Sequence, residues 1–242
     1  MADISPAQPR KLAPSQLPPL PATLVCIARH GETDWNKSGI LQGWLDVPIN
    51  EIGRLQAIAL AQSLVNAGFS AVWTSPLARA SETASIVAER LHLPAPQHHN
   101  GLRERHFGAI QGIPKSELAE LNPTQLEQIL RRNPNAEFVG GESRDEFADR
   151  VLDALGDIGA RQPGSRLLVV THGWVMDVIT RQVDGQARGT VLHRKPTNGE
   201  CLWIEVAAGS FRRAAAALAQ HSVNGALQAA DVQANPIFDR AK

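Results

Sequence analysis

Four residues of this 242-residue chain combine the side-chain types and the positions that phosphoryl chemistry needs. Each lies at or soon after the end of a short apolar run: Arg29, His30, Arg79 and His172. A guanidinium presents a planar fork of donors that fits phosphate oxygens, and a neutral imidazole is a competent nucleophile. Nearby cations favour the uncharged form of a histidine. We therefore expect a site that binds a phosphate dianion, with one histidine accepting the phosphoryl group and the other stabilising charge.

The apolar runs before these residues predict buried strands. They cover residues 23–28, 71–74 and 166–170, and the last has the strongest strand pattern. Strands of a parallel sheet end at one edge, where ligands bind beside helix N-termini that favour anions. Two closing strands are predicted over 200–206 and about 211–219, although the Ala-rich end of the second is also compatible with a helix.

Helices are predicted between these strands. Asn50 is expected to cap a helix over about 51–66 whose apolar face contains Ile52, Leu55 and Ala59. Ser75-Pro76 is expected to start another helix, with apolar residues at steps of three and four: Leu77, Ala80, Ala84, Val87 and Leu91. Residues 113–133 fit one or two short helices interrupted at Asn122-Pro123.

The second half of the chain continues the same alternation. Ser-Arg-Asp-Glu at 143–146 is a capping box that starts a helix to about residue 160, with this buried stripe: Phe147, Val151, Leu155 and Ile158. A further helix follows Gly173. The alternation predicts an α/β protein, a three-layer α/β/α sandwich with a mostly parallel central sheet. We expect one domain over 22–222, a Pro-rich, extended or mobile arm over 1–21 and a tail over 223–242.

The overall composition argues against several classes of function. The 24 lysines and arginines balance 24 acids, which argues against a nucleic-acid partner or a polybasic membrane-surface protein. No apolar run approaches the roughly 20 residues that cross a membrane, and prolines interrupt any signal-like segment. Cys26 and Cys201 are too few for a disulfide framework or a structural zinc site. We expect a cytoplasmic protein that acts on a small ligand.

Five separated segments carry the chemical residues in a characteristic order. They are Arg-His-Gly-Glu-Thr at 29–33 with Gln-Gly-Trp at 42–44, Ser-Pro-Leu-Ala-Arg at 75–79, Leu-Arg-Glu-Arg-His-Phe-Gly at 102–108, Gly-Glu-Ser at 141–143 and Thr-His-Gly at 171–173. In this order they resemble the histidine phosphatase superfamily, in its phosphoglycerate mutase-like branch. The resemblance covers about residues 23–222 and implies the fold of that branch.

The resemblance implies a role for each matching position. His30 would be the nucleophile that forms phosphohistidine, and Glu104 would protonate the leaving group and then activate water. Glu32, Glu82 and Glu142 are other acids near the same loops. The remaining residues would bind the phosphate (Arg29, Arg79, His172, Asn36 and the backbone of Gly173) or line the substrate mouth (Thr33, Gln42 and Gly43). The resemblance implies no metal and no cofactor.

Phosphohistidine serves both phosphatases and mutases. Lys115 and the pair Arg131-Arg132 are similar to cations of the cofactor-dependent mutases, although we favour a solvated helix face for the arginine pair. The segment 133–140 lacks the long insertion that encloses the mutase site, and Trp174 stands where mutases usually have Asn. An open site favours transfer to water, so we predict a metal-independent phosphatase.

The predicted substrate is a small phosphorylated metabolite, and the sequence favours no particular oligomeric state. Phosphoglycerates, sugar phosphates, phosphoserine, nucleotide-pathway intermediates and phosphorylated ribazole are candidates, with specificity expected in the loops 37–48, 105–140 and 174–198. The alternatives are a 2,3-bisphosphoglycerate-dependent phosphoglycerate mutase and a non-catalytic phosphate-binding scaffold of the same fold. A nucleotide-binding α/β protein is disfavoured because no Gly-rich phosphate loop follows the first strand.

Overall fold

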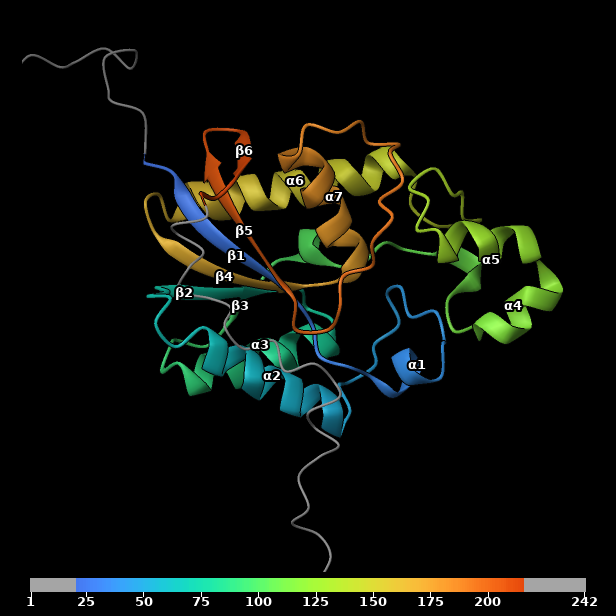
Figure 1. Cartoon of the computed structure of the whole chain (residues 1–242), viewed down its shortest axis with the longest axis horizontal. Coiled ribbons are helices and arrows are strands. Elements are labelled where there is room, and N and C mark those ends of the chain that lie inside the picture. The colour runs from blue at the N-terminus through green and yellow to red at the C-terminus, as the bar shows by residue number, and fades with distance from the viewer. Residues whose placement is uncertain (1–20, 216–242) are drawn as a thin grey trace, which may run out of the picture.

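The computed structural model describes residues 21–215, so the predicted tail and nearly all of the predicted arm lie outside the described residues. A six-stranded sheet carries helices on both faces (Figure 1). The strands are β1 (Thr23–Arg29), β2 (Ala71–Thr74), β3 (Gln97–His98), β4 (Arg166–Thr171), β5 (Cys201–Ala207) and β6 (Ser210–Arg213). The helices are α1 (Asp34–Lys37), α2 (Glu51–Ser63), α3 (Ala78–Arg90), α4 (Lys115–Leu121), α5 (Pro123–Leu130), α6 (Arg144–Arg161) and α7 (Gly173–Val183).

The sheet has the order β3-β2-β4-β1-β5-β6. The first four of these strands run parallel, whereas β5 and β6 pair in antiparallel fashion at one side. In the β1–β4 pair Arg29 lies opposite Thr171, so both strands end at the same edge. The predicted sandwich with a mostly parallel sheet is confirmed. β3 was not predicted, because a strand of two residues carries no periodic pattern.

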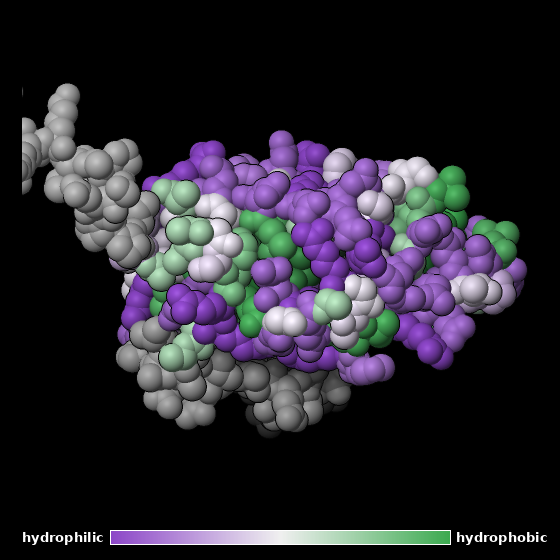
Figure 2. Space-filling view, turned by 90° about the horizontal axis from the view of Figure 1, so that it is seen from above, coloured by the Kyte–Doolittle hydropathy of each residue, from purple (hydrophilic) through white to green (hydrophobic). Residues whose placement is uncertain are grey.

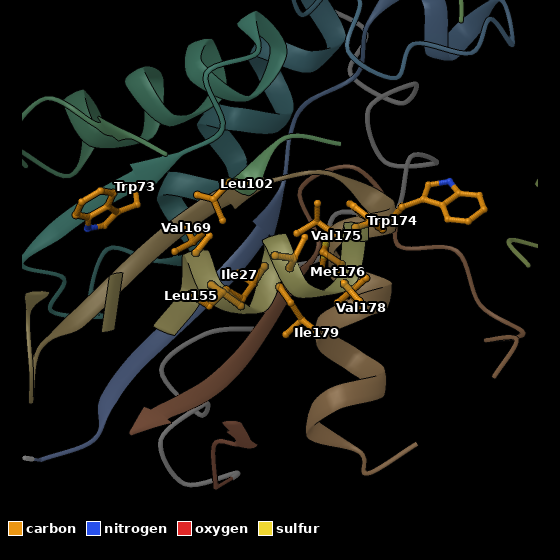
Figure 3. Close-up of a cluster of buried hydrophobic side chains, with 14 of the residues drawn as sticks. Ile27, Trp73, Leu102, Leu155, Val169, Trp174, Val175, Met176, Val178 and Ile179 are labelled. Carbon is orange, nitrogen blue, oxygen red and sulfur yellow. The ribbon is translucent and has the colours of Figure 1, made fainter. Parts of the chain in front are cut away.

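Alternate residues of β1 face opposite layers of the core. Val25 and Ile27 pack in a cluster with α6 and α7, whereas Cys26 and Ala28 pack with α2 and α3. Figure 3 shows Ile27 among side chains of α6 and α7. Every residue of β1 is buried, as expected for a strand covered on both faces. The residues that follow β1 are therefore held by a strand fixed from both sides.

The buried face of α2 differs from the predicted face. Asn50 caps the helix as predicted, through a bond from the Gly53 N–H to its side chain. However, Ile52 and Leu55 are 45% and 46% exposed, and small residues turn inward instead. The buried residues of α2 are Gly53, Ala57, Leu60 and Ala61.

A close backbone contact explains this orientation of α2. A Cβ on Gly53 would lie 2.2 Å from the carbonyl oxygen of Glu32, and one on Gly31 would lie 2.4 Å from the carbonyl oxygen of Gly53. Only glycine at both positions allows α2 to pack this closely against the segment after β1. The predicted face was chosen from the spacing of large apolar residues, and that spacing contains no information about a backbone contact made by glycine.

The start of α3 also differs from the prediction. Leu77 occupies the N-cap position, and the Ala78 N–H donates to Asp46 Oδ1 at 2.6 Å. Ser75 lies two residues before the N-cap, where its hydroxyl accepts from the Leu77 N–H at 3.3 Å and also bonds with His172 Nε2 at 2.8 Å. The predicted apolar face is buried at four of its five positions: Leu77, Ala80, Ala84 and Val87.

Helices α4 to α7 begin close to where the sequence predicts, whereas the short α1 was not predicted, because a loop was expected up to Asn50. The capping box of Ser143 and Glu146 starts α6, and Asn122 caps α5 directly after α4. β6 is shorter than the strand predicted over about 211–219, of which residues 216–219 lie outside the described range. Within that range no helix is long and apolar enough to cross a membrane. Figure 2 shows the face above the sheet as mostly hydrophilic, with hydrophobic side chains in small groups.

Candidate active site

A cavity of about 140 Å³ lies at the carboxyl edge of the sheet. Its walls come from the end of β1, from α1 and the loop after it, and from the starts of α3 and α7. Eight of the ten predicted site residues line it: Arg29, His30, Asn36, Gln42, Gly43, Arg79, Glu104 and Gly173. The fold thus brings residues from distant segments of the chain to one place.

Two predicted residues do not line this cavity. Thr33 is fully buried and caps α1, accepting a bond from the Asn36 N–H at 3.0 Å and donating its own N–H to Asn36 Oδ1. His172 is also fully buried, with its ring 5.2 Å from the ring of His30. The structure therefore places Thr33 and His172 behind the residues that face the cavity.

The hydrogen bond of His30 fixes its tautomer. Nδ1 lies 2.6 Å from the carbonyl oxygen of Gly31. Because a carbonyl oxygen only accepts, we assign the proton to Nδ1, which leaves a lone pair on Nε2. Asn198 Nδ2 donates to the carbonyl oxygen of His30 itself at 2.7 Å and restrains the backbone there. The arrangement presents an imidazole with one nitrogen ready for nucleophilic attack.

Both histidines are held in the neutral form. Burial lowers the pKa of His30 well below its usual value, and the neighbouring Arg79 and Arg29 lower it further. The pKa of His172 is lowered for the same first reason, followed by Arg79 and then His30. Both imidazoles are therefore uncharged near neutral pH.

The two arginines are buried and still have donors to offer. Arg79 donates to the carbonyl oxygens of Leu45 and Gly43 at 3.0 and 2.7 Å, and Arg29 donates to that of Pro196 at 2.7 Å. Within the described chain the Nε of each arginine is buried without a hydrogen-bond partner. Burial lowers the pKa of each to about 10, so both remain cationic at neutral pH. An anion in the cavity would satisfy these donors.

One acid faces the cavity, and the others are engaged elsewhere. Glu104 lines it, with Oε1 accepting from the Arg105 N–H at 2.9 Å. Among the other candidates, Glu142 forms a two-pronged pair with Arg150, with both distances 2.7 Å. Glu32 accepts from Asn50, and Glu82 lies 3.6 Å from Arg54 in an exposed pair. The structure thus separates Glu104 from the alternatives that the sequence left open.

The prediction for the arginine pair is wrong at one position. Arg131 is exposed and pairs with Glu127 at 2.8 Å, as expected for a solvated face. Arg132 is only 8% exposed, lines the cavity and pairs with Asp177 of α7 at 2.6 Å. It also lies over the ring of Trp174, 5.0 Å from the centroid. A left-handed backbone at Arg132, with φ of 51°, turns it away from the direction that the helix pattern implies.

Two lysines complete the cation-rich wall. Lys115 and Lys195 line the same cavity, and Lys195 was not singled out from the sequence. The signal available was weak: a basic residue in the 174–198 loop, where specificity was expected. Among residues 21–215 no group of three or more His, Cys, Asp or Glu side chains is placed to hold a metal ion.

A sheet edge that brings a neutral histidine and two buried arginines into one cavity, with a second neutral histidine behind them, suits an anionic ligand such as phosphate. The chain belongs to the histidine phosphatase superfamily (branch 1), whose family model matches residues 25–217. It is 39% identical to the metal-independent phosphoserine phosphatase of Arabidopsis thaliana over 65% of this chain and 67% of that protein. It is 31% identical to 2,3-bisphosphoglycerate-dependent phosphoglycerate mutase 2 of Gloeobacter violaceus over 66% of this chain and 75% of that one.

The solved structures agree with this assignment. Bacillus stearothermophilus YhfR superposes with a TM-score of 0.73 at 31% identity, over 80% of this chain and 96% of that one. The family and its phosphatase relatives identify the chain as a phosphatase of this superfamily.

Proposed function

We propose that the protein hydrolyses a small phosphorylated metabolite through a phosphohistidine on His30, without a metal ion. The observation that carries the proposal is the state of His30. It is neutral, its Nδ1 is bound to the Gly31 carbonyl oxygen, and it lies in the cavity that two buried arginines line. A lone pair on Nε2 beside donors for phosphate oxygens is what phosphoryl transfer to histidine requires.

In the first step His30 Nε2 attacks the phosphorus atom and the bond from phosphorus to the ester oxygen breaks. The bonding electrons leave with that oxygen, which takes a proton from Glu104. Arg29, Arg79 and the Gly173 N–H at the start of α7 hold the phosphoryl oxygens during the transfer. His172, 5.2 Å from His30, supports the charge that develops on the phosphoryl group.

In the second step water takes the phosphoryl group from His30. The Glu104 carboxylate accepts a proton from the water, and the bond from Nε2 to phosphorus breaks to release inorganic phosphate and neutral imidazole. Gln42 and Gly43 line the mouth through which the alcohol product leaves. Thr33 has a different role from the one implied by resemblance: it positions Asn36 through their reciprocal capping bonds.

A phosphoglycerate mutase is the second candidate. The observation that favours it is Arg132, which lies in the cavity instead of on a solvated face and could hold a second phosphate or a carboxylate. A mutase would return the phosphoryl group from His30 to a retained product, where a phosphatase passes it to water.

Labelling stopped by a denaturing alkaline quench tests the intermediate, because phosphohistidine survives base. Brief incubation with a ³²P-labelled phosphomonoester should give an acid-labile, base-stable phosphoprotein that His30→Ala abolishes. His98→Ala, at an exposed histidine of β3, is the matched control and should label normally. Phosphate release without labelling would refute the phosphohistidine mechanism, and absence of both labelling and phosphate release would favour a non-catalytic scaffold.

A metabolite panel then separates phosphatase from mutase. Phosphate release should be measured with phosphoglycerates, phosphoserine, sugar phosphates and nucleotide-pathway phosphates, beside a coupled assay for exchange between 3- and 2-phosphoglycerate. Efficient exchange with little phosphate release would replace the phosphatase by the mutase.

A further inference from the structure

A second and larger cavity adjoins the one that contains His30. It has a volume of about 530 Å³, almost four times that of the inner cavity, and lies between the end of α5 and the segment 191–195. The two cavities share Leu130, Arg132 and Lys195 as lining residues. We call this second space the outer cavity. A ligand whose phosphoryl group reaches His30 can therefore extend past Arg132 and Lys195.

The outer cavity is strongly basic. Five of the residues that line it are Arg131, Arg132, His193, Arg194 and Lys195, and no aspartate or glutamate is among the described lining residues. Arg131 and Arg194 are paired with acids that lie outside the lining, and Arg132 is paired with Asp177. Lys195 differs from these three, because none of the ion pairs within residues 21–215 includes it.

Lys195 also stands in a field of like charge. Partial desolvation holds the pKa of Lys195 below its usual value, and Arg29, Lys115 and Arg132 lower it further. Lys115 lines the inner cavity, and its pKa is likewise lowered by desolvation and then by Arg132 and Arg29. Cations gathered without a facing carboxylate disfavour one another until an anion joins them.

The segment that carries Lys195 is tied to the active site. Arg29 donates to the carbonyl oxygen of Pro196, the next residue, at 2.7 Å. Asn198 donates to the carbonyl oxygen of His30 at 2.7 Å, and the Gly199 N–H donates to that of Arg29 at 3.1 Å. Lys195 therefore has a defined place relative to the residues that hold the phosphoryl group, as a specificity residue requires.

We propose that the outer cavity binds a second anionic group of the substrate, and that Lys195 is the residue that selects it. This inference rests on the proposed function and narrows its substrate class. The substrate is a phosphomonoester long enough to span both cavities, and its far end carries a carboxylate or a second phosphate. An ammonium at the far end is disfavoured, because it would enter a cation-lined space with no acid among its described lining residues.

Binding of non-hydrolysable phosphonates tests this inference without turnover. The probes are 6-phosphonohexanoate, its neutral carboxamide, hexane-1,6-bisphosphonate and the short acid 3-phosphonopropionate with its carboxamide. Calorimetry should show the long acid binding about tenfold more tightly than its amide, a larger ratio than that of the short pair. Comparing the affinity of hexane-1,6-bisphosphonate with that of 6-phosphonohexanoate shows whether the outer cavity prefers a phosphate or a carboxylate at the far end of the ligand.

Removal of the lysine charge tests the residue. Lys195→Gln should remove most of the acid-over-amide preference of the long pair. The ratio within each variant is compared, because Lys195 also lines the inner cavity and its loss weakens the binding of both probes. Lys37→Gln, at an exposed lysine of α1 outside both cavities, is the matched control and should retain the preference.

The proposed outer anion site would be overturned if the wild-type protein bound the long acid and its amide equally. It would also be overturned if the acid-to-amide affinity ratio were the same for the long and the short pair. A preference that Lys195→Gln leaves intact would overturn the assignment of Lys195. The proposed function is tested separately by phosphate release from phenyl phosphate, which has no far anion. Failure of this reaction together with failure of phosphate release across the metabolite panel refutes the hydrolytic mechanism, whereas the binding ratios still decide the outer site.

Discussion

Replacement of Asp177 by asparagine should change how stability depends on pH. Asp177 is 1% exposed beneath the cavity and pairs with Arg132. Burial raises the pKa of its carboxyl group from 3.8 to about 6, although Arg132 acts in the opposite direction. Between these two values the folded chain binds a proton that the unfolded chain has released. The free energy of unfolding therefore falls as pH rises through this window, and the loss is complete above about pH 6.

The size of this effect follows from the shift. About two pKa units at about 1.36 kcal/mol each give a full cost of about 3 kcal/mol. The linkage relation gives roughly half of this cost at about pH 5 and nearly all of it at about pH 7.5. Between these two conditions the wild-type protein should lose about 1.4 kcal/mol of unfolding free energy that the Asp177→Asn variant does not lose.

Urea denaturation at the two pH values measures the difference. The cost of leaving Arg132 without its carboxylate is the same at both and cancels. Asp184→Asn is the matched control: a bond from Arg213 lowers the pKa of Asp184 below 3.8, so its carboxyl is ionised in both states across the window. That variant should stay parallel to wild type. If the unfolding free energy of Asp177→Asn changed with pH as much as that of wild type, the raised pKa would not be the cause of the pH dependence.

Two further predictions follow from single contacts, and a third substitution serves as a control. Ser75→Ala removes the 2.8 Å bond to His172 Nε2, so kcat for phosphate release should fall about tenfold with a smaller change in KM; an unchanged kcat in steady-state assays would contradict this. Gly53→Ala should lower the free energy of unfolding by about 3 kcal/mol or more, because its Cβ would lie 2.2 Å from the Glu32 carbonyl oxygen. Gly156→Ala is the control: this glycine lies in a helix, a Cβ there would meet nothing within 4 Å, and the free energy of unfolding should rise by up to about 1 kcal/mol. If thermal unfolding shows that Gly53→Ala and Gly156→Ala lose equal stability, the packing argument is refuted.

The gathering of His30, Arg79 and His172 could be predicted from sequence because it depends on a simple rule. Each residue follows a strand of one parallel sheet, and such strands end at one edge. Arg132 and Lys195 follow no strand, and their approach to the cavity depends on tertiary structure. Arg132 needs a left-handed backbone and a partner on α7, and Lys195 needs a loop tied to the strand-end backbone. No local pattern encodes either arrangement.

The errors at α2 and Ser75 have a common physical origin. Local propensity predicts that a large apolar side chain of a helix packs in the core and that a serine just before a helix caps it. At Gly53 a backbone contact with the strand-end segment decides which face of α2 is buried. At Ser75 the hydroxyl accepts from the Leu77 N–H and also bonds with a histidine 97 positions away, and Asp46 accepts from the first N–H of the helix. In both places long-range contacts at the site override local preference.

A last consequence concerns the charge of the two histidines when an anion binds. Without a ligand, burial and the arginines keep both imidazoles neutral. A dianion at roughly 5 Å, comparable to the 5.2 Å between the rings, would interact with an imidazolium by about 6–7 kcal/mol at an effective dielectric near 20. An interaction of that size raises the pKa of the nearer imidazole by about five units and so opposes the lowering by burial and the arginines.

The proton should go to His172, because His30 must keep its Nε2 lone pair for attack. Sulfate is a suitable probe, since it does not titrate near neutral pH, and calorimetry in buffers of different ionisation enthalpy counts the protons taken up. Wild type should take up protons when sulfate binds, whereas His172→Gln should bind sulfate with clearly less proton uptake. Equal uptake by the variant would place the proton elsewhere, and no uptake by wild type would mean that both histidines stay neutral around the bound anion.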